Sequence, residues 1–335
     1  MGHGKPGYPL ATRLNSFLGV GGAASVADAV RAVAAVLGIT GLEPNYPQHL
    51  RDLPEANLAD LLAETKLRLT GVNLRFEGDR FAGGAFTNPR AETRREAIAT
   101  AVAAVAFAKR HGARHVILWM ATDGFADPFT VDYDAAWELE IEGLRQVASA
   151  DPSMLVSLEY KPAEPSRSPF RPMVGSMGEA LLAVSAVGLP NVGITLDLCH
   201  SLMAGEHPPA AASLALARAK LFGVHLNDGD GKIDDGLPVG TRHPLATLEL
   251  LAILRQWGYR GGIYFDTFPD AAQAAVECAA NVATVRHYEG ILDRLDPARL
   301  SSARARGGFA AVRAYLRDLG LLAEGDESVV RAGTI

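Results

Sequence analysis

Short apolar runs rich in β-branched residues alternate along the chain with longer stretches of helical periodicity. The runs predict strands over residues 12–18, 41–45, 69–75, 115–120, 154–161, 192–198, 221–227 and 262–268. The stretches between them predict helices over residues 25–37, 56–67, 91–111, 131–149, 177–187, 210–219, 244–257 and 270–288. From Thr93 to Arg110 the apolar residues fall on one side of a helix and the charged residues on the other. The alternation predicts an α/β protein.

The strand count indicates how these units are arranged. Continuous apolar runs such as Val192-Gly-Ile-Thr-Leu196 are typical of parallel strands that are buried on both faces. Eight strand–helix units in roughly 270 residues predict a single (β/α)8 TIM barrel. We place this barrel at residues 11–289, after a flexible N-terminus over residues 1–10.

An open, doubly wound sheet is the competing architecture, and it would need a phosphate-binding turn after an early strand. Gly19-Val-Gly-Gly22 fits the looser form of that turn, with Ala24 in its last place and Glu43 where a ribose-binding acid would lie. The motif is weak when it stands alone. It also leaves the acidic residues of the later strands unexplained, so a loop after the first strand is the better interpretation.

Residues 290–335 are surplus to a barrel. The segment from Leu292 to Leu319 has a helical pattern, which Pro297 and the pair Gly307-Gly308 interrupt. We therefore predict a C-terminal helical extension that packs on the outside of the barrel or across a subunit interface. The second possibility predicts a homo-oligomer, either a dimer or a tetramer.

The composition narrows the class of protein. Of 335 residues, 48% are hydrophobic and 21% charged, which is typical of a globular protein with a large core. The net charge of −6 gives no support for a nucleic-acid surface. Two cysteines are too few for a disulfide framework. No apolar run reaches the ~18 residues of a membrane span, and the polar start does not resemble a signal peptide. We expect a cytoplasmic protein with a small-molecule partner, no nucleic acid and no membrane.

Acidic residues and one histidine stand at the ends of the last four predicted strands. In a TIM barrel the catalytic residues lie at these C-terminal strand ends. The four residues are Glu159, Asp197, His225 and Asp266. Three carboxylates and one imidazole suit Mg²⁺, Mn²⁺ or Co²⁺ better than a structural zinc ion. Without a metal the carboxylates would repel one another.

Each of these residues also has a purely structural interpretation. Glu159 could pair with Lys161, Asp197 or Asp266 could cap the segment that follows it, and His225 could be a hydrogen-bonded core residue. The convergence of all four at one mouth favours a divalent metal site.

A second group lies nearby in sequence. His200 follows Asp197 by three residues, and Asp234 and Asp235 lie in a Gly- and Asp-rich loop after His225. Such loops are usually solvated turns, but this one would lie above the barrel. It could hold a second metal ion, because paired metals clamp adjacent oxygens. The loop lacks the terminal Glu of an EF-hand.

Several motifs together resemble the xylose isomerase-like barrel superfamily over roughly residues 10–290. They are Leu158-Glu-Tyr-Lys-Pro-Ala-Glu-Pro165, Asp197-Leu-Cys-His-Ser-Leu-Met-Ala-Gly205, His225-Leu-Asn-Asp228, Lys232-Ile-Asp-Asp-Gly-Leu237, Gly83-Gly-Ala-Phe-Thr-Asn-Pro89 with Arg94-Arg95, Gly112-Ala-Arg-His115 and Trp119-Met-Ala-Thr-Asp-Gly124. The ligand order Glu, Asp, His, Asp is most similar to rhamnose isomerase-type members. Ketose 3-epimerases of this superfamily usually end the set with Glu, where this chain has Asp266.

The resemblance implies isomerisation between an aldose and a ketose through a 1,2-hydride shift on an open-chain monosaccharide. Lys161 would contact the sugar and stabilise negative charge on its O1. His200 and Asp234 would lie where the hydroxyl proton is removed, and Trp119 would form an apolar wall. The substrate-binding set is completed by Arg75, Asn73 and Glu43.

Other activities fit the same residues. Glu159 and Asp266 could act as an acid–base pair in a ketose 3-epimerase. Lyase or deglycosidase chemistry on an oxidised sugar needs only one metal and a base. A metal-dependent sugar-binding barrel without turnover is the non-enzymatic alternative.

The chain departs from the family pattern in three places. No histidine is obvious at the end of the second strand for opening the sugar ring, although His49 follows closely. Arg75 stands where xylose isomerases have an aromatic residue, and it could bind a substrate carboxylate or phosphate or simply pair with Glu77. The second-metal pair reads Asp234-Asp235, so one of its carboxylates is displaced.

Overall fold

The computed structural model describes residues 7–322, which form two compact units over residues 7–285 and 286–322. The larger unit contains a curled sheet of eight parallel strands in the order β1-β12-β11-β10-β8-β6-β5-β3. These strands are β1 (Leu10–Thr12), β3 (Asn45–Tyr46), β5 (Val72–Arg75), β6 (His115–Trp119), β8 (Leu155–Glu159), β10 (Val192–Asp197), β11 (Leu221–Leu226) and β12 (Ile263–Phe265).

Two short contacts close the sheet into a ring. The Thr40 amide donates a hydrogen bond to the Leu10 carbonyl at 2.9 Å, and Arg13 forms a parallel bridge with Glu43. Next to this seam, β2 (Gly41–Leu42) pairs in parallel with β4 (Arg68–Leu69). The ring confirms the predicted (β/α)8 barrel.

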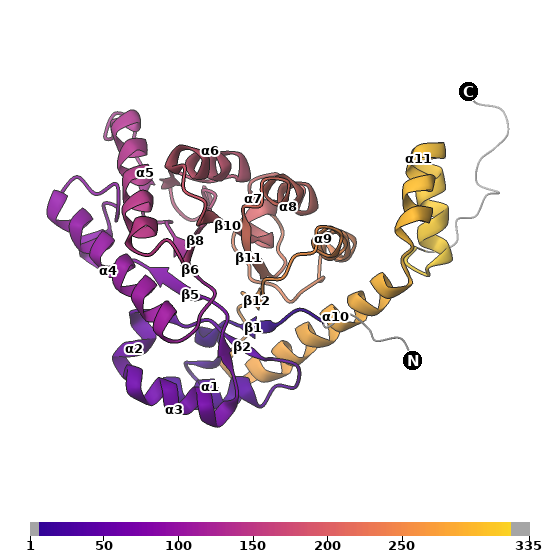
Figure 1. The fold of residues 1–335 in the computed structure, drawn as a ribbon, viewed down its shortest axis with the longest axis horizontal. Helices are drawn as coiled ribbons and strands as arrows, with labels where there is room; N and C mark the ends of the chain where they lie inside the picture. The colour runs from indigo at the N-terminus through magenta and orange to yellow at the C-terminus, as the bar shows by residue number, and fades with distance from the viewer. Residues whose placement is uncertain (1–6, 323–335) are drawn as a thin grey trace. The chain divides into compact units, whose positions relative to one another are not determined.

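Helices surround the strands, as Figure 1 shows. They are α1 (Val26–Ala34), α2 (Gln48–Asp52), α3 (Glu55–Thr65), α4 (Ala91–Arg110), α5 (Tyr133–Ala150), α6 (Met177–Val187), α7 (Leu198–Met203), α8 (Pro208–Leu216), α9 (Pro244–Gln256) and α10 (Ala274–Arg294), the last of which runs from the first unit into the second. A two-stranded antiparallel sheet joins β7 (Gly124–Phe125) to β9 (Arg171–Pro172).

The barrel core explains the continuous apolar runs. Every residue of β10 and β11 is buried, because one face of each strand meets the barrel interior and the other meets helices. Polar side chains also lie inside, where Ser157 and Thr195 share a hydrogen bond of 2.8 Å. A Cβ atom at Gly223 would lie 2.5 Å from the Thr195 hydroxyl, so only glycine fits there.

The first strand differs from the prediction. It covers Leu10–Thr12 instead of 12–18, and the next residues form a 3-10 turn, η1, over Leu14–Phe17. Leu14 and Phe17 are both buried and three residues apart, a spacing that suits a 3-10 turn and not a strand. Leu10 therefore belongs to the barrel, although we expected it in a flexible N-terminus. Pro9 is also held there, because its carbonyl accepts the Ile263 amide at 2.9 Å, whereas residues 1–6 lie outside the described residues.

Smaller differences have local causes. The second strand is divided at Pro44, which has no amide hydrogen, and the third at Gly71. The last barrel helix begins at Ala274 and not at 270, because a 3-10 turn, η3 (Ala271–Gln273), precedes it. The short helices α2 and α7 were not predicted.

The second unit contains the predicted helical extension, α11 (Pro297–Asp318). The backbone is non-helical at Gly308, with φ 53° and ψ −119°, so α11 consists of two helical segments. They contact each other where the Asp296 amide donates to the Tyr315 hydroxyl at 2.6 Å and Arg299 pairs with Asp318 at 3.1 Å.

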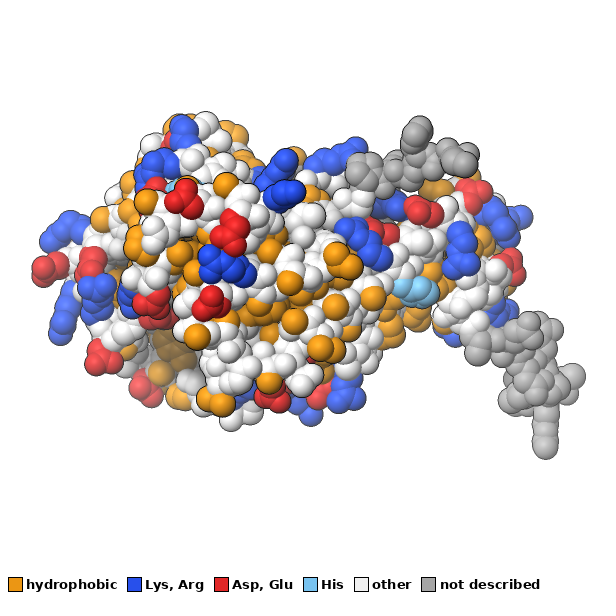
Figure 2. Space-filling model, turned by 90° about the horizontal axis from the view of Figure 1, so that it is seen from below, with side chains coloured by type: hydrophobic (Ala, Val, Ile, Leu, Met, Phe, Trp, Pro, Cys, Tyr) orange, Lys and Arg blue, Asp and Glu red, His pale blue; other side chains and the backbone are white. Residues whose placement is uncertain are grey.

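On the face drawn in Figure 2, hydrophobic side chains lie between acidic and basic ones. Among the residues described, no helix has the length and apolar character needed to cross a membrane.

Candidate metal centre

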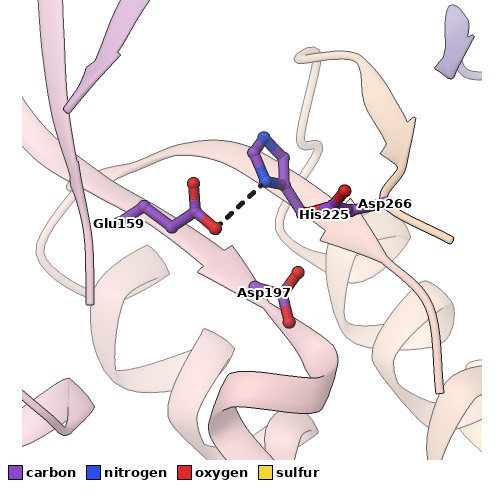
Figure 3. A group of neighbouring side chains, drawn as sticks. All are labelled: Glu159, Asp197, His225 and Asp266. Atoms are coloured by element: carbon purple, nitrogen blue, oxygen red, sulfur yellow. Dashed lines mark ion pairs between the residues drawn. The ribbon is translucent and has the colours of Figure 1, made fainter. Parts of the chain in front are cut away.

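The four predicted strand-end residues converge in the structure. Glu159 ends β8, Asp197 ends β10, His225 lies on β11, and Asp266 follows β12. All four are buried, and each offers one ligand atom within 4.8 Å of the others. Figure 3 shows their side chains around a common space, with Glu159 and His225 joined by an ion pair of 3.4 Å. They meet because parallel barrel strands bring their C-terminal ends to one mouth.

Several atoms of this cluster lack a hydrogen-bond partner among the described residues. They are Glu159 Oε1, both ring nitrogens of His225, and Asp266 Oδ1. A buried polar atom left unsatisfied costs about 1–3 kcal/mol. A divalent cation would satisfy the two carboxylate oxygens and one of the two ring nitrogens, and a set of three carboxylates and one imidazole suits it chemically. The residues therefore fit a metal ion, and the cluster could bind one.

Burial and mutual repulsion change the pKa values of the carboxyl groups in the cluster. Burial raises the pKa of Asp197 to about 7, and the neighbouring Asp234, Glu159 and Asp266 oppose its ionisation further. Burial also raises the pKa of Asp266, although Arg75 and Arg13 counteract it. For Glu159, burial is outweighed by His225, His200 and Arg75 together, which lower the pKa of that carboxyl. A bound cation would remove the repulsion between the carboxylates.

The carboxylate of Asp197 accepts two hydrogen bonds. Its Oδ1 accepts the His200 amide at 2.9 Å and so caps α7, while its Oδ2 accepts the Asn227 side-chain amide at 2.9 Å. The capping role considered for Asp197 thus exists together with its place in the cluster. Asp266 caps no helix; it pairs with Arg13 at 3.3 Å.

A chain of contacts leads from the cluster to Lys161. His200 Nδ1 lies 3.5 Å from Glu159 Oε1, and its Nε2 lies 3.2 Å from Asp234 Oδ2. The Lys161 ammonium is 2.9 Å from the same Asp234 oxygen and 2.7 Å from Glu164. Lys161 is thus buried beside the cluster without pairing with Glu159. Its pKa is raised because Asp234 and Glu164 outweigh the effect of burial.

The predicted second metal site is not assembled. Asp235 turns toward its own loop, where its Oδ2 accepts the Asp230 amide at 2.9 Å. Asp234 instead faces two cationic partners, His200 and Lys161. Burial lowers the pKa of His200, but Asp197 and Asp234 raise it overall to about 9. These contacts form an ion-pair network, and residues 7–322 contain one metal-type cluster.

The predicted substrate-binding residues lie on neighbouring strands. Glu43 is buried, its Oε2 lies 3.6 Å from His225 Nε2, and its Oε1 accepts the Thr70 hydroxyl at 2.8 Å. Asn73 is buried, and its side-chain amide oxygen has no hydrogen-bond partner among the described residues. The Arg75 guanidinium lies over the Trp119 ring, 4.8 Å from its centroid. The alternative pairing of Arg75 with Glu77 does not occur.

His49 is buried and neutral. Its Nδ1 accepts the Asn45 amide at 2.9 Å, so the ring proton is on Nε2, which contacts the Asn15 side-chain oxygen. Burial lowers the pKa of His49 to about 4. Both ring nitrogens are used within the protein, so His49 is not a free base for ring opening.

Three residues of the site were not singled out from the sequence. Arg13, which directly follows β1, pairs with Asp266, and the centroid of the Tyr264 ring lies 4.6 Å from that of the His225 ring. Asn227 donates to Asp197 and to the Asp266 carbonyl, and accepts the Cys199 amide at 2.9 Å. The sequence offered a way to find Asn227. It follows His225 by two residues, and side chains two apart in an extended segment point to the same side.

A family model described as xylose isomerase-like TIM barrel matches residues 31–282. The chain belongs to this family. Over 227 residues it is 28% identical to the xylose isomerase of Thermus thermophilus, a match that covers 66% of this chain and 58% of that relative. The chain thus matches less than two thirds of the relative's length.

Solved structures share the fold of this family. A D-tagatose 3-epimerase-like protein superposes with a TM-score of 0.67 at 15% identity, covering 86% of this chain and 98% of that chain. The IOLI protein with a zinc atom superposes with a TM-score of 0.60 at 15% identity, covering 85% of this chain and 97% of that chain. At these identities the similarity shows the fold alone.

Proposed function

We propose that the protein is a divalent-metal-dependent isomerase that interconverts an open-chain aldose and its ketose by a 1,2-hydride shift. The observation that carries this proposal is the buried Lys161 ammonium, joined to the Glu/Asp/His/Asp cluster through Asp234 and His200. The relative in Thermus thermophilus, a xylose isomerase, supports the same reaction class.

Glu159, Asp197, His225 and Asp266 would hold the metal. When bound, a divalent ion polarises a carbonyl and neutralises charge that develops on adjacent oxygens. The oxygen-rich donor set favours Mn²⁺, Mg²⁺ or Co²⁺.

Lys161 supplies a fixed positive charge beside this cluster. Asp234 and Glu164 hold two of the three ammonium donors, which leaves one for the substrate. In our proposal this donor faces the sugar's O1, where negative charge develops as hydrogen moves between C1 and C2.

In our proposal Asp234 accepts a hydrogen bond from the substrate hydroxyl that loses its proton, and it stays ionised because, against the effect of burial, His200 and Lys161 lower its pKa. Its Oδ2 is held by Lys161 and His200, whereas its buried Oδ1 has no partner among residues 7–322. Asn73 has a similar free oxygen for a sugar hydroxyl, and Trp119 offers an apolar wall that excludes water from the transfer.

Epimerisation at C3 is the second candidate. Glu159 Oε1 and Asp266 Oδ1 accept no hydrogen bond in the part of the chain described, so two carboxylates converge that could remove and return a proton. Burial raises the pKa of Asp266 although Arg13 pairs with it, whereas the pKa of Glu159 is lowered, so the two carboxyls differ as a proton donor and acceptor would. We favour the isomerase because it uses the buried Lys161 ammonium and because a xylose isomerase is among the relatives.

The test begins with metal-stripped protein, screened with aldoses and ketoses after restoring Mn²⁺, Co²⁺ or Mg²⁺. Turnover of the active sugar is then followed in deuterated water. An isomerase using a hydride shift transfers hydrogen between C1 and C2 without solvent exchange, whereas a 3-epimerase incorporates deuterium at C3.

Lys161→Met separates the two reactions further. Loss of a charge-stabilising donor should lower the kcat of the isomerase by roughly 10²–10³-fold. Lys109→Met is the matched control, because Lys109 is an exposed lysine paired with Asp151 on the barrel exterior. Deuterium at C3 together with an active Lys161→Met variant would overturn the isomerase in favour of the epimerase.

A further inference from the structure

The guanidinium of Arg75 is a part-buried cation without an anionic partner among residues 7–322. Its Nε is buried and makes no hydrogen bond, and within residues 7–322 no carboxylate forms an ion pair with it. The other cations at this mouth are paired, Arg13 with Asp266 and Lys161 with Asp234. A buried charge is costly unless an opposite charge or a hydrogen-bond acceptor meets it.

The sheet register places Arg75 at the height of the metal cluster. Arg75 aligns with Trp119 on the neighbouring strand, and Trp119 aligns with Glu159 on the next. The guanidinium stacks on the Trp119 ring at 4.8 Å, which fixes its plane and leaves its edge donors available. The Gln48 side chain holds the Arg75 carbonyl at 3.0 Å.

Arg75 could instead serve only to balance the acidic cluster. Asp266, Glu159 and Asp234 do act on it, because they raise its pKa against the effect of burial. Such balance acts at a distance and does not occupy the hydrogen-bond donors of the guanidinium, however. No carboxylate of residues 7–322 forms an ion pair with Arg75, so these donors remain free for a ligand.

We infer that Arg75 forms an anion subsite beside the metal centre, and that the substrate is an open-chain sugar bearing a carboxylate or a phosphate. The planar guanidinium matches either group through two parallel hydrogen bonds. This inference rests on the proposed function, because it assumes that a sugar binds at the cluster.

Three unreactive probes test it by calorimetry on Mn²⁺-loaded protein. Sorbitol, gluconate and sorbitol 6-phosphate share a six-carbon open chain and differ in bearing no anion, a carboxylate or a phosphate. The wild type should bind one of the two anions about 10- to 100-fold more tightly than sorbitol. The probe that binds more tightly shows whether the subsite recognises a carboxylate or a phosphate.

Arg75→Gln should abolish this preference while leaving sorbitol affinity unchanged, and Arg75→Lys should retain part of it. Arg68→Gln is the matched control, since Arg68 is an exposed arginine on β4. If Arg75 only balanced the cluster, Arg75→Gln would tighten Mn²⁺ binding and leave the ratio of probe affinities as in the wild type, which would overturn the subsite.

The outcomes also separate this inference from the proposed function. Failure of the wild type to bind Mn²⁺ would refute the metal site itself. Normal Mn²⁺ binding, with neither anion bound more tightly than sorbitol, would refute the anion subsite and leave the isomerase standing.

Discussion

Glu43 illustrates how one buried contact changes the role of a residue. From the sequence we assigned it to the substrate, but it lies against His225 and away from any solvent. Metal-binding histidines commonly donate their second ring N–H to a carboxylate, which fixes the ring's orientation. His225 Nδ1 faces Glu159 and its Nε2 faces Glu43, so Glu43 is placed to orient the ring.

We therefore expect Glu43→Gln to weaken metal binding by about 10- to 100-fold, because an amide holds the imidazole N–H less well than a carboxylate does. Titration of metal-stripped protein with Mn²⁺, followed by calorimetry, measures this directly. Thr70→Val removes only the hydroxyl that supports Glu43, so its effect should be smaller. Unchanged Mn²⁺ affinity in Glu43→Gln would return Glu43 to a substrate role.

Glu140 on α5 carries a second prediction at the residue scale. Both of its carboxylate oxygens are buried and unpartnered in the described structure, and burial together with Asp123 raises its pKa well above the ordinary 4.5. Burial also raises the pKa of Asp123 from 3.8 to about 6. The folded protein thus holds these protons more tightly than the unfolded chain. Their stabilising contribution is complete below about pH 4. It is lost for Asp123 as the pH rises through about 6, and for Glu140 as the pH rises through its own raised pKa.

Glu140→Gln removes the carboxyl group that must ionise in the core, so the variant does not lose this stability as the pH rises. We expect the Tm of the variant to exceed that of the wild type by about 2–6 °C at pH 8, with a gap that shrinks toward pH 4.5. Thermal unfolding at the two pH values gives the comparison. Glu138→Gln changes an exposed residue of the same helix and should show no pH-dependent gap. A gap of equal size at both pH values would contradict the explanation.

At the scale of elements, the predictions succeeded where periodicity and end signals agree. The α6 helix was predicted with its observed bounds, since Ser176 precedes it and Gly188 follows it in a left-handed conformation. The first strand was misplaced because Leu14 and Phe17 are apolar without being extended. Apolar composition alone does not distinguish a short strand from a 3-10 turn when the segment is brief.

The cap of α6 can be tested separately. The Ser176 hydroxyl accepts the Glu179 amide at 3.3 Å, and Glu179 in turn accepts the Gly175 amide at 2.8 Å. Ser176→Ala should cost about 1 kcal/mol, or roughly 2–4 °C in Tm. Ser185→Ala, at an exposed position inside the same helix, should leave Tm unchanged or slightly higher. Equal Tm values for both variants would show that the cap contributes nothing.

At the scale of the whole molecule, the barrel and the four converging strand ends were predictable, because a parallel barrel brings every strand's C-terminal end to one mouth. The side chains that contact those four residues could not be predicted from the sequence. Arg13 meets Asp266 across almost the entire chain, and Asp235 turns away from its neighbour Asp234 to bind its own loop. Both outcomes depend on side-chain directions in loops, which no periodicity specifies.

The extension is the whole-molecule feature that leads to a prediction. Its two helical segments contact each other through Asp296 and Tyr315, while Phe309 is 77% exposed. We keep the prediction that the tail packs across a subunit interface, so sedimentation should find a dimer or tetramer at micromolar concentration. Phe309→Ser should weaken that association. A monomeric wild type would refute it.

The amide of Asn227 has a consequence for the lifetime of the protein. Deamidation, the slow loss of ammonia that makes asparagine a thermolabile residue, would replace its NH₂ group with a charged oxygen. That oxygen would stand where the amide now meets Asp197 at 2.9 Å, and two carboxylates would oppose each other beside the metal centre. Asn227 is fully buried, and both ends of its side chain are held. The packing that aligns the strand ends therefore also shields the site from chemical ageing.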